Sequence, residues 1–304
     1  MHEGSRKAII AAFIANLGIA ISKFIGFAVT GSASLLAEAI HSVADTGNQA
    51  LLMLGGKRAR RQATPDHPFG YGRERYFWAF VVALVLFSMG GLFAIYEGIE
   101  KLRHPHKPES LAVAVIILVA AILMESWSFR TAIKESRPLK GKRSWWSFIR
   151  RSKNPELPVV LLEDLGALVG LFLALGGVVL ATVTDNARFD ALGSLGIGIL
   201  LVAIAMLLAV EMKGLLIGES ASPEMQEHIV RAITTAPDVV RLIHMRTEHI
   251  GPDELLVGAK IELGSALSAT QVADAINVIE TRVREAVPEA RVIYLEPDIQ
   301  RAAT

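Results

Sequence analysis

The sequence predicts an α-helical membrane domain of six transmembrane helices over residues 1–213, followed by an α+β domain over residues 214–304. Two observations support this fold class. Apolar residues make up 52% of the chain and charged residues only 20%, and six apolar segments approach the roughly 20 residues that span a bilayer. After residue 214 these long apolar segments give way to short amphipathic patterns typical of a water-exposed domain.

The six predicted spans are separated by short polar loops and contain many glycines, which permit close helix packing in lipid. The first span is too long for a signal-peptide core and no small-residue cleavage site follows it, so we expect it to be retained. The predicted spans run approximately over residues 8–29, 34–56, 77–99, 110–132, 157–183 and 190–212.

Basic residues predict the orientation, because cytoplasmic loops of membrane proteins carry an excess of lysine and arginine. They concentrate between spans two and three and between spans four and five, the second loop also holding Trp145 and Trp146 as candidate interfacial anchors. The loops on the opposite side of the membrane carry few basic residues. Both termini are therefore expected in the cytoplasm, and the protein in the cell (inner) membrane.

The C-terminal segment predicts an α–β–β–α–β order. Ser222 and Pro223 have the residue types of a helix N-cap and first helical position. Two alternating stretches, VVRLIHMRTEHI and ELLVGAKIEL, are separated by GPD and predict a β-hairpin. An amphipathic helix and a last short strand, ARVIYLEP, follow, which indicates an open sheet with two helices on one face.

Four polar residues lie on one stripe of the second span: Glu38, His41, Asp45 and Asn48. Their spacings of three, four and three residues match one helical face. Ionisable groups in a bilayer normally face a bundle interior and mark an ion or proton pathway. Because imidazole and carboxylate are both ligands of divalent transition metals, the stripe predicts metal transport.

The chain resembles the cation diffusion facilitator family over nearly its whole length. The motifs that carry the resemblance are HSVAD in the second span, HPFGYGRERYFWAF at the third, LLEDLGALVG in the fifth, DALGSLGIG in the sixth and LLIGES after it. The resemblance implies a homodimeric exporter of zinc or a similar divalent cation, driven by proton antiport, with a ferredoxin-like cytoplasmic domain.

The same resemblance implies the metal ligands. His41 and Asp45 match a ligand pair on the second helix, and Asp164 matches the second member of a pair on the fifth. The first member of that pair is replaced by Val160, which cannot bind metal. Glu163, about 100° round the helix from Asp164, Asn48 on the second span, or a water molecule are the candidates for the missing ligand.

Other polar residues have structural interpretations that we prefer. Asn16, Lys23 and Glu125 are expected to hydrogen-bond or ion-pair between helices, with Lys23 an alternative partner for Glu163 or Asp164. His67 matches a secondary metal-ligand position of some family members, but its companion histidine is replaced by Tyr71. We expect a turn there.

The C-terminal domain lacks most of the histidines that bind metal in zinc-sensing relatives. His244 matches one of them, whereas Lys260 and Tyr294 replace others, and Glu296 supplies one carboxylate. Lys260 would repel a cation. We therefore expect this domain to form a homodimer without needing metal.

The sequence thus predicts a secondary-active transporter that exports divalent transition-metal cations, zinc first and iron, manganese or cobalt as alternatives, by proton antiport with alternating access. Metal cations, protons and membrane lipid are its expected partners, with no cofactor and no enzymatic activity. A net charge of +1 gives no indication of nucleic-acid binding. A non-transporting, metal-responsive membrane scaffold on the same fold is the alternative, because Val160 removes one ligand.

Overall fold

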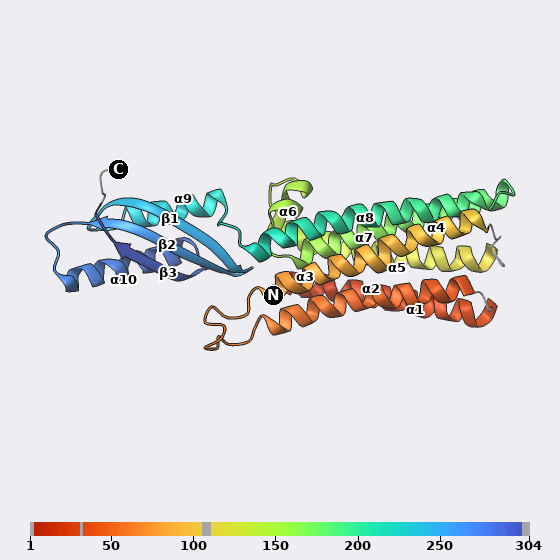
Figure 1. Cartoon of the computed structure of the whole chain (residues 1–304), viewed down its shortest axis with the longest axis horizontal. Helices are drawn as coiled ribbons and strands as arrows, with labels where there is room; N and C mark the ends of the chain where they lie inside the picture. The colour runs from red at the N-terminus through yellow and green to blue at the C-terminus, as the bar shows by residue number, and fades with distance from the viewer. Residues whose placement is uncertain (1–2, 31–32, 105–110, 300–304) are drawn as a thin grey trace. The chain divides into compact units, whose positions relative to one another are not determined.

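The computed structural model describes residues 3–30, 33–104 and 111–299 (Figure 1). The chain divides into two compact units. One unit comprises Met1–Arg60 and Glu74–Lys213, and the other comprises Arg61–Arg73 and Gly214–Thr304. The sequence pattern did not predict that the loop 61–73 groups with the C-terminal segment.

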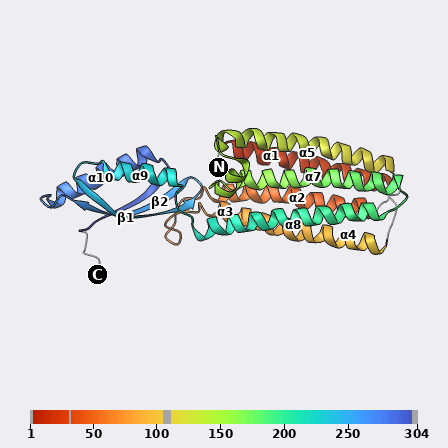
Figure 2. The ribbon, with the colours of Figure 1, turned by 90° about the horizontal axis from the view of Figure 1, so that it is seen from above.

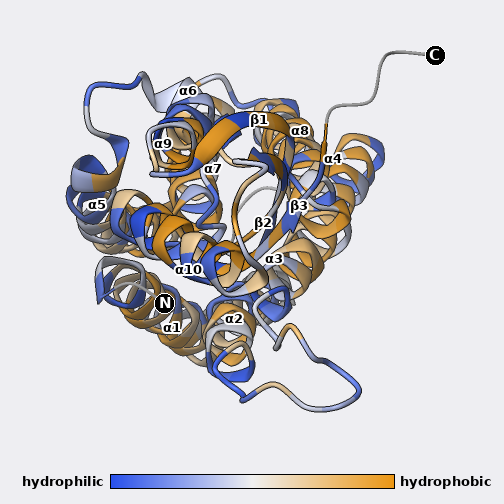
Figure 3. Cartoon of the chain, turned by 90° about the vertical axis from the view of Figure 1, so that its left-hand side faces the viewer, coloured by the Kyte–Doolittle hydropathy of each residue, from blue (hydrophilic) through white to orange (hydrophobic). Residues whose placement is uncertain are grey.

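The first unit is a bundle of long helices (Figures 1 and 2). Five helices in the described part of the chain are long and apolar enough to cross a membrane, one fewer than the six predicted spans. Hydrophobic residues dominate their ribbons in Figure 3. They are α1 (Glu3–Thr30), the continuous rod Glu74–Arg103, α5 (Leu111–Lys140), α7 (Glu156–Val183) and α8 (Arg188–Ile217).

The second predicted span forms α2 (Ala33–Arg58), a helix of 26 residues. It packs along α1 on one side and α3 on the other, and the three run side by side in both views (Figures 1 and 2). Its polar stripe lowers its mean hydropathy below that of the five apolar helices. We infer that α2 is the sixth spanning helix, shielded from lipid by its neighbours.

The third rod contains an irregularity that the sequence did not predict. It consists of α3 (Glu74–Val85), a π-helical segment η1 (Leu86–Leu92) and α4 (Phe93–Arg103). Gly91 lies against α8 so closely that a methyl group there would come within 2.6 Å of a Val202 methyl carbon. A methyl group at Gly90 would come within 3.9 Å of His41 Cε1, so η1 borders the candidate site. π-helical segments are frequent at functional sites.

The helices extend beyond several predicted span limits. α5 continues to Lys140, eight residues past the expected end, and a short helix α6 (Trp145–Arg151) follows it. At the start of α3, Arg75 makes a buried two-point ion pair with Glu156 of α7, with Nη2 at 2.8 Å from Oε2. Arg75 is therefore a packing residue rather than a free loop charge.

The second unit has the predicted α–β–β–α–β order. Strand β1 pairs antiparallel with β2, and β2 pairs parallel with β3. Helices α9 and α10 contact each other and cover one face of the sheet (Figure 2). The elements are α9 (Pro223–Thr234), β1 (Val239–Gly251), β2 (Glu254–Leu263), α10 (Ala269–Ala286) and β3 (Ala290–Pro297).

Local sequence signals explain these elements. Ser222 caps α9 by accepting a hydrogen bond from the Met225 amide, and Ser268 with Gln271 forms a capping box at α10. Alternate residues of β2, from Leu255 to Ile261, are buried against the helices. The residues between them lie on the uncovered face of the sheet.

Candidate metal centre

The α2 stripe places His41 beside Asp45. His41 Nε2 lies 3.8 Å from Asp45 Oδ2, and the two side chains are 24% and 28% exposed. The imidazole stacks on Phe93 of α4, with ring centroids 6.3 Å apart. The pair is thus partly accessible, as a site that must load and release an ion requires. The side chain of Glu38, the fourth member of the predicted stripe, lies outside the described residues.

Helix α7 carries Glu163 and Asp164 in its buried interior, with exposed fractions of 4% and 0%. The helix is continuous over Glu156–Val183, so no local distortion brings the two carboxylates onto one face. Consecutive residues point about 100° apart on a helix. Accordingly, Glu163 contacts α2 and Asp164 contacts α5.

Two amide side chains of α2 hold the Glu163 carboxylate. Asn48 Nδ2 donates to Oε1 at 3.0 Å, and Gln49 Nε2 donates to Oε2 at 2.8 Å. Asn16 of α1 in turn donates to Gln49 Oε1 at 3.3 Å. This chain of hydrogen bonds joins α1, α2 and α7. Sequence reasoning missed Gln49, although it stands next to Asn48 in an apolar helix.

Asp164 contacts α5 through Ser128, whose hydroxyl donates to Oδ2 at 2.7 Å. Glu125, one turn before Ser128, is 2% exposed. Glu125 is therefore a third buried carboxyl side chain of the bundle interior, beside Glu163 and Asp164 of α7 in burial but carried by α5. A lone glutamate within an apolar span was the sequence signal for it.

Three oxygens of this region are buried and accept no hydrogen bond from the described residues. They are Asn48 Oδ1, Glu125 Oε2 and Asp164 Oδ1. Carbonyl and carboxylate oxygens that accept no hydrogen bond in a water-poor interior are suitable ligands for a cation. Within the described part of the chain, however, no three His, Asp or Glu side chains lie close enough together to enclose a metal ion.

Lys23 is also buried near this region, and its Nζ donates to Ser42 Oγ of α2 at 3.0 Å. The prediction of an interhelical role for Lys23 is therefore confirmed by its bond from α1 to α2. Val160, at the position of the missing ligand, is fully buried.

The loop histidine His67 lies in a turn of the second unit. Its backbone exchanges hydrogen bonds with Thr64, and its ring stacks on Tyr71 with centroids 4.6 Å apart. This geometry agrees with the predicted turn. Whether His67 binds metal stays a prediction.

A row of polar residues crosses the uncovered face of the sheet. Lys260 of β2 is in register with His244 of β1 and Glu296 of β3. Lys260 Nζ lies 2.8 Å from a Glu296 carboxylate oxygen and 3.0 Å from one of Asp298. The hydrogen bonds that Lys260 donates to these carboxylates raise its pKa above the usual value. Both carboxylates thus already share one cation of the protein itself.

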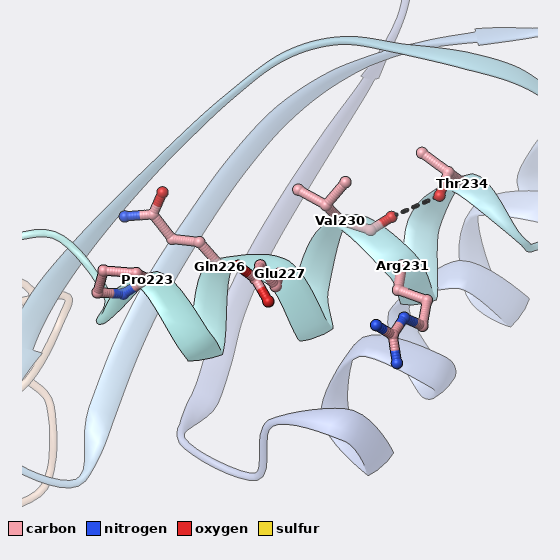
Figure 4. Close-up of a pocket in the computed structure, with 6 residues that line it drawn as sticks. All are labelled: Pro223, Gln226, Glu227, Val230, Arg231 and Thr234. Atoms are coloured by element: carbon pink, nitrogen blue, oxygen red, sulfur yellow. Dashed lines mark hydrogen bonds between the residues drawn. The ribbon is translucent and has the colours of Figure 1, made fainter.

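A shallow hollow also runs along α9, away from these polar groups (Figure 4). Among its lining residues, the Thr234 hydroxyl donates a hydrogen bond to the Val230 carbonyl. Gln226, Glu227 and Arg231 supply its polar groups, a mixed set without a metal-ligand pattern. The full lining is Pro223, Gln226, Glu227, Val230, Arg231 and Thr234.

Comparison with known proteins places the helical unit in a family. The family model for the cation efflux transmembrane domain matches residues 9–217. The chain belongs to the cation efflux, or cation diffusion facilitator, family. The resemblance predicted from HSVAD and HPFGYGRE is thereby confirmed, and with it an integral, multi-pass membrane protein.

Several relatives in this cation efflux family carry informative names. The mitochondrial proton-coupled zinc antiporter SLC30A9 of Xenopus laevis is 34% identical over 86% of this chain and 47% of its own length. Metal tolerance protein C4 of Arabidopsis thaliana is 28% identical over 87% of this chain and 58% of its own. The cation-efflux pump FieF of Escherichia coli is 26% identical over 95% and 91%. The chain spans about half the length of the zinc antiporters that it matches.

Proposed function

We propose that this protein exports divalent transition-metal cations, zinc first, in exchange for protons. The observation that carries the proposal is the set of three buried carboxyl side chains that α5 and α7 place in the bundle interior, Glu125, Glu163 and Asp164, together with the partly exposed pair His41 and Asp45 on α2. Buried acidic groups are expensive unless a cation or protons neutralise them. The names of the relatives, a proton-coupled zinc antiporter and a cation-efflux pump, support the same activity.

We assign His41, Asp45 and Asp164 as metal ligands. His41 and Asp45 are partly accessible, so an ion can reach them, and Asp164 has a carboxylate oxygen without a hydrogen bond from the described residues. Asn48 uses its amide nitrogen on Glu163, which leaves Oδ1 for a cation. Glu163, held by two amides, orients α2 against α7. Imidazole with carboxylates suits zinc, with iron, manganese and cobalt as competitors.

The mechanism follows from competition between metal and protons. A ligand must be deprotonated to hold the ion, so protons arriving from the far side displace it. His41 is the natural coupling group, because an imidazole nitrogen can bind either a metal ion or a proton, but not both. Rocking of the helices would close the ligands around the ion and then expose them to the opposite side.

Flux measurements in sealed proteoliposomes test this proposal. Zinc should move against its gradient when an opposing proton gradient is imposed, and collapse of that gradient should stop it. His41→Ala should change the pH dependence of the flux. Zinc accumulation that persists without a proton gradient would contradict antiport. Parallel assays with iron, manganese and cobalt would rank the metals.

A non-transporting, metal-responsive scaffold is the second candidate. It is favoured by Val160 at a ligand position and by the lack of an enclosed set of three ligands among the described residues. The two candidates differ in whether bound zinc is carried across the membrane. Zinc that binds to the purified protein and is lost with Asp45→Ala, but never crosses the vesicle membrane, would support the scaffold.

We further propose that the C-terminal unit forms a homodimer through its uncovered sheet face. α9 and α10 cover the other face, and the uncovered one carries Leu256, Val292 and the 60%-exposed Tyr294. Lys260 already pairs with the acidic groups Glu296 and Asp298, so dimerisation should not require metal. The full-length protein should remain dimeric in detergent with a strong chelator. Monomers with chelator that dimerise on adding zinc would contradict this.

The membrane in which the protein resides stays a prediction. The sequence favours a cell membrane with both termini in the cytoplasm, whereas the SLC30A9 relatives are named as mitochondrial. Fluorescence microscopy of a tagged chain in its own host, with protease protection of each terminus, decides both location and orientation.

A further inference from the structure

The segment between α5 and α7 is the most basic stretch of the chain. Residues 137–153 contain seven lysines and arginines and no acidic residue. Such a run is normally a solvated, mobile loop. Here it contains the ordered helix α6 and joins the ends of two membrane-length helices. The ordered helix within this basic segment indicates a defined surface rather than a flexible loop.

Three contacts hold α6 and the residues that follow it against the helical unit. Phe148 is buried, and Arg150 Nε lies 2.8 Å from a carboxylate oxygen of Glu211 on α8. Beyond α6, Asn154 exchanges hydrogen bonds with Ser5 at the start of α1, at 3.1 and 3.3 Å. The segment is therefore fixed at its helix and at its far end.

The same segment also combines aromatic and basic groups. Trp145 and Trp146 are both exposed, the latter at 58%. Lys140 Nζ lies over the Trp145 ring at 5.3 Å, and the Arg150 guanidinium lies over the Trp146 ring at 5.8 Å. Exposed tryptophan interleaved with basic residues is typical of side chains at the level of lipid headgroups.

The length of α5 places this surface near the membrane boundary. Its 30 residues extend about 45 Å at 1.5 Å per residue, against a hydrocarbon core of about 30 Å. The part of α5 that exceeds this thickness must therefore lie outside the hydrocarbon core. Since the last turn of α5 carries Arg137 and Lys140, this is the end that meets the headgroup region.

We propose that α6 and its basic flanks form a binding surface for anionic phospholipid headgroups. The tryptophans would lie among the headgroups and upper acyl chains, and Arg137, Lys142 and Arg151, all exposed, would bind lipid phosphates. Complementary charge selects the occupant, because the segment has seven positive charges and no negative one. The surface is independent of the proposed transport ligands on α2 and α7.

Fluorescence quenching tests this surface in the full-length protein. It is reconstituted in phosphatidylcholine vesicles with increasing fractions of phosphatidylglycerol, and either lipid carries the bromine quencher. Brominated phosphatidylglycerol should quench the tryptophans more strongly than brominated phosphatidylcholine at equal fractions. The difference should disappear with Trp145→Phe and Trp146→Phe, which leave Trp78 and Trp127 in place.

Charge removal provides the decisive comparison. Each basic residue contributes roughly fivefold to anionic-lipid affinity at low salt, so Arg137→Gln, Lys142→Gln and Arg151→Gln together should raise the half-saturating phosphatidylglycerol fraction on the order of tenfold or more. The matched control removes three exposed arginines of the C-terminal unit, Arg231→Gln, Arg284→Gln and Arg291→Gln, and should change nothing.

The proposal would be overturned by equal quenching by the two lipids in the unmodified protein, by an unchanged preference in the α6 triple variant, or by an equal loss in the control variant. Free inorganic phosphate at matched ionic strength should not compete with the lipid. Competition would show a phosphate-ion site in place of a lipid surface.

Discussion

The bundle interior and the uncovered sheet face contain the same kinds of side chains in opposite electrostatic situations. In the bundle, Asp164 and Glu163 receive hydrogen bonds from neutral hydroxyl and amide donors. On the sheet, Glu296 and Asp298 pair with Lys260. Neutral donors orient a carboxylate without cancelling its charge, whereas lysine cancels it. The comparison teaches that the partners of an acidic group, more than its presence, decide whether a metal ion can use it.

The largest expected effect comes from the bundle carboxylates. Asp164→Asn or Asp45→Asn should lower zinc flux at least about 100-fold, because each removes a charged ligand. Stopped-flow flux in proteoliposomes measures it. Glu97→Gln, an acidic residue of α4 that pairs with Lys101, is the matched control and should retain flux. Normal flux in both aspartate variants would remove the site assignment.

The second prediction converts the sheet row into a metal site. Lys260→His, in a chain that also carries Asp45→Asn and Asp164→Asn, should gain zinc binding, because His244 and Glu296 lie on the adjacent strands in the same row. Metal content by mass spectrometry after chelator washing reports it. Lys260→Gln removes the positive charge without adding a ligand and should gain little. Equal zinc uptake by both variants would show that charge alone mattered.

The third prediction concerns the missing ligand of α7. Val160→Asp should tighten zinc binding about tenfold if this position faces the bound ion. Val159→Asp is the matched control, since Val159 is equally buried and lies one residue away on the helix. Both variants bury a new carboxylate, so their folding costs are similar. Calorimetric zinc titration that fails to distinguish them would mean that α7 presents another face to the metal.

The smallest expected effect is on the pH dependence of the C-terminal unit. The pKa of Lys260 is raised above 10.5 in the folded state. Its ion pairs therefore stabilise the fold fully below that pH and are lost as pH rises through the raised value. The thermal midpoint should fall slightly more steeply above pH 10.5 in the unmodified protein than in Lys260→Gln. Parallel curves would indicate that this exposed cluster contributes nothing measurable.

Hydropathy located the spans but not the helix ends. α5 continues to Lys140 because backbone hydrogen bonds of a helix form equally well beyond the hydrocarbon, where its side chains become polar. The short α6 escaped prediction because seven residues give too little periodicity to recognise. By contrast, the Ser222 cap and the alternation in β2 are local signals, and both appear in the structure as expected.

The sequence alone determined the family, the order of the elements and the types of residue available for metal binding, because these depend on local pattern and motif. Only the tertiary structure decided which groups meet. Glu163 joins Asn48 and Gln49, and Asp164 joins Ser128, because a step of about 100° turns neighbouring residues toward different helices. Likewise, Lys260 meets Glu296 only because β2 and β3 pair in parallel at one register, which no single strand specifies.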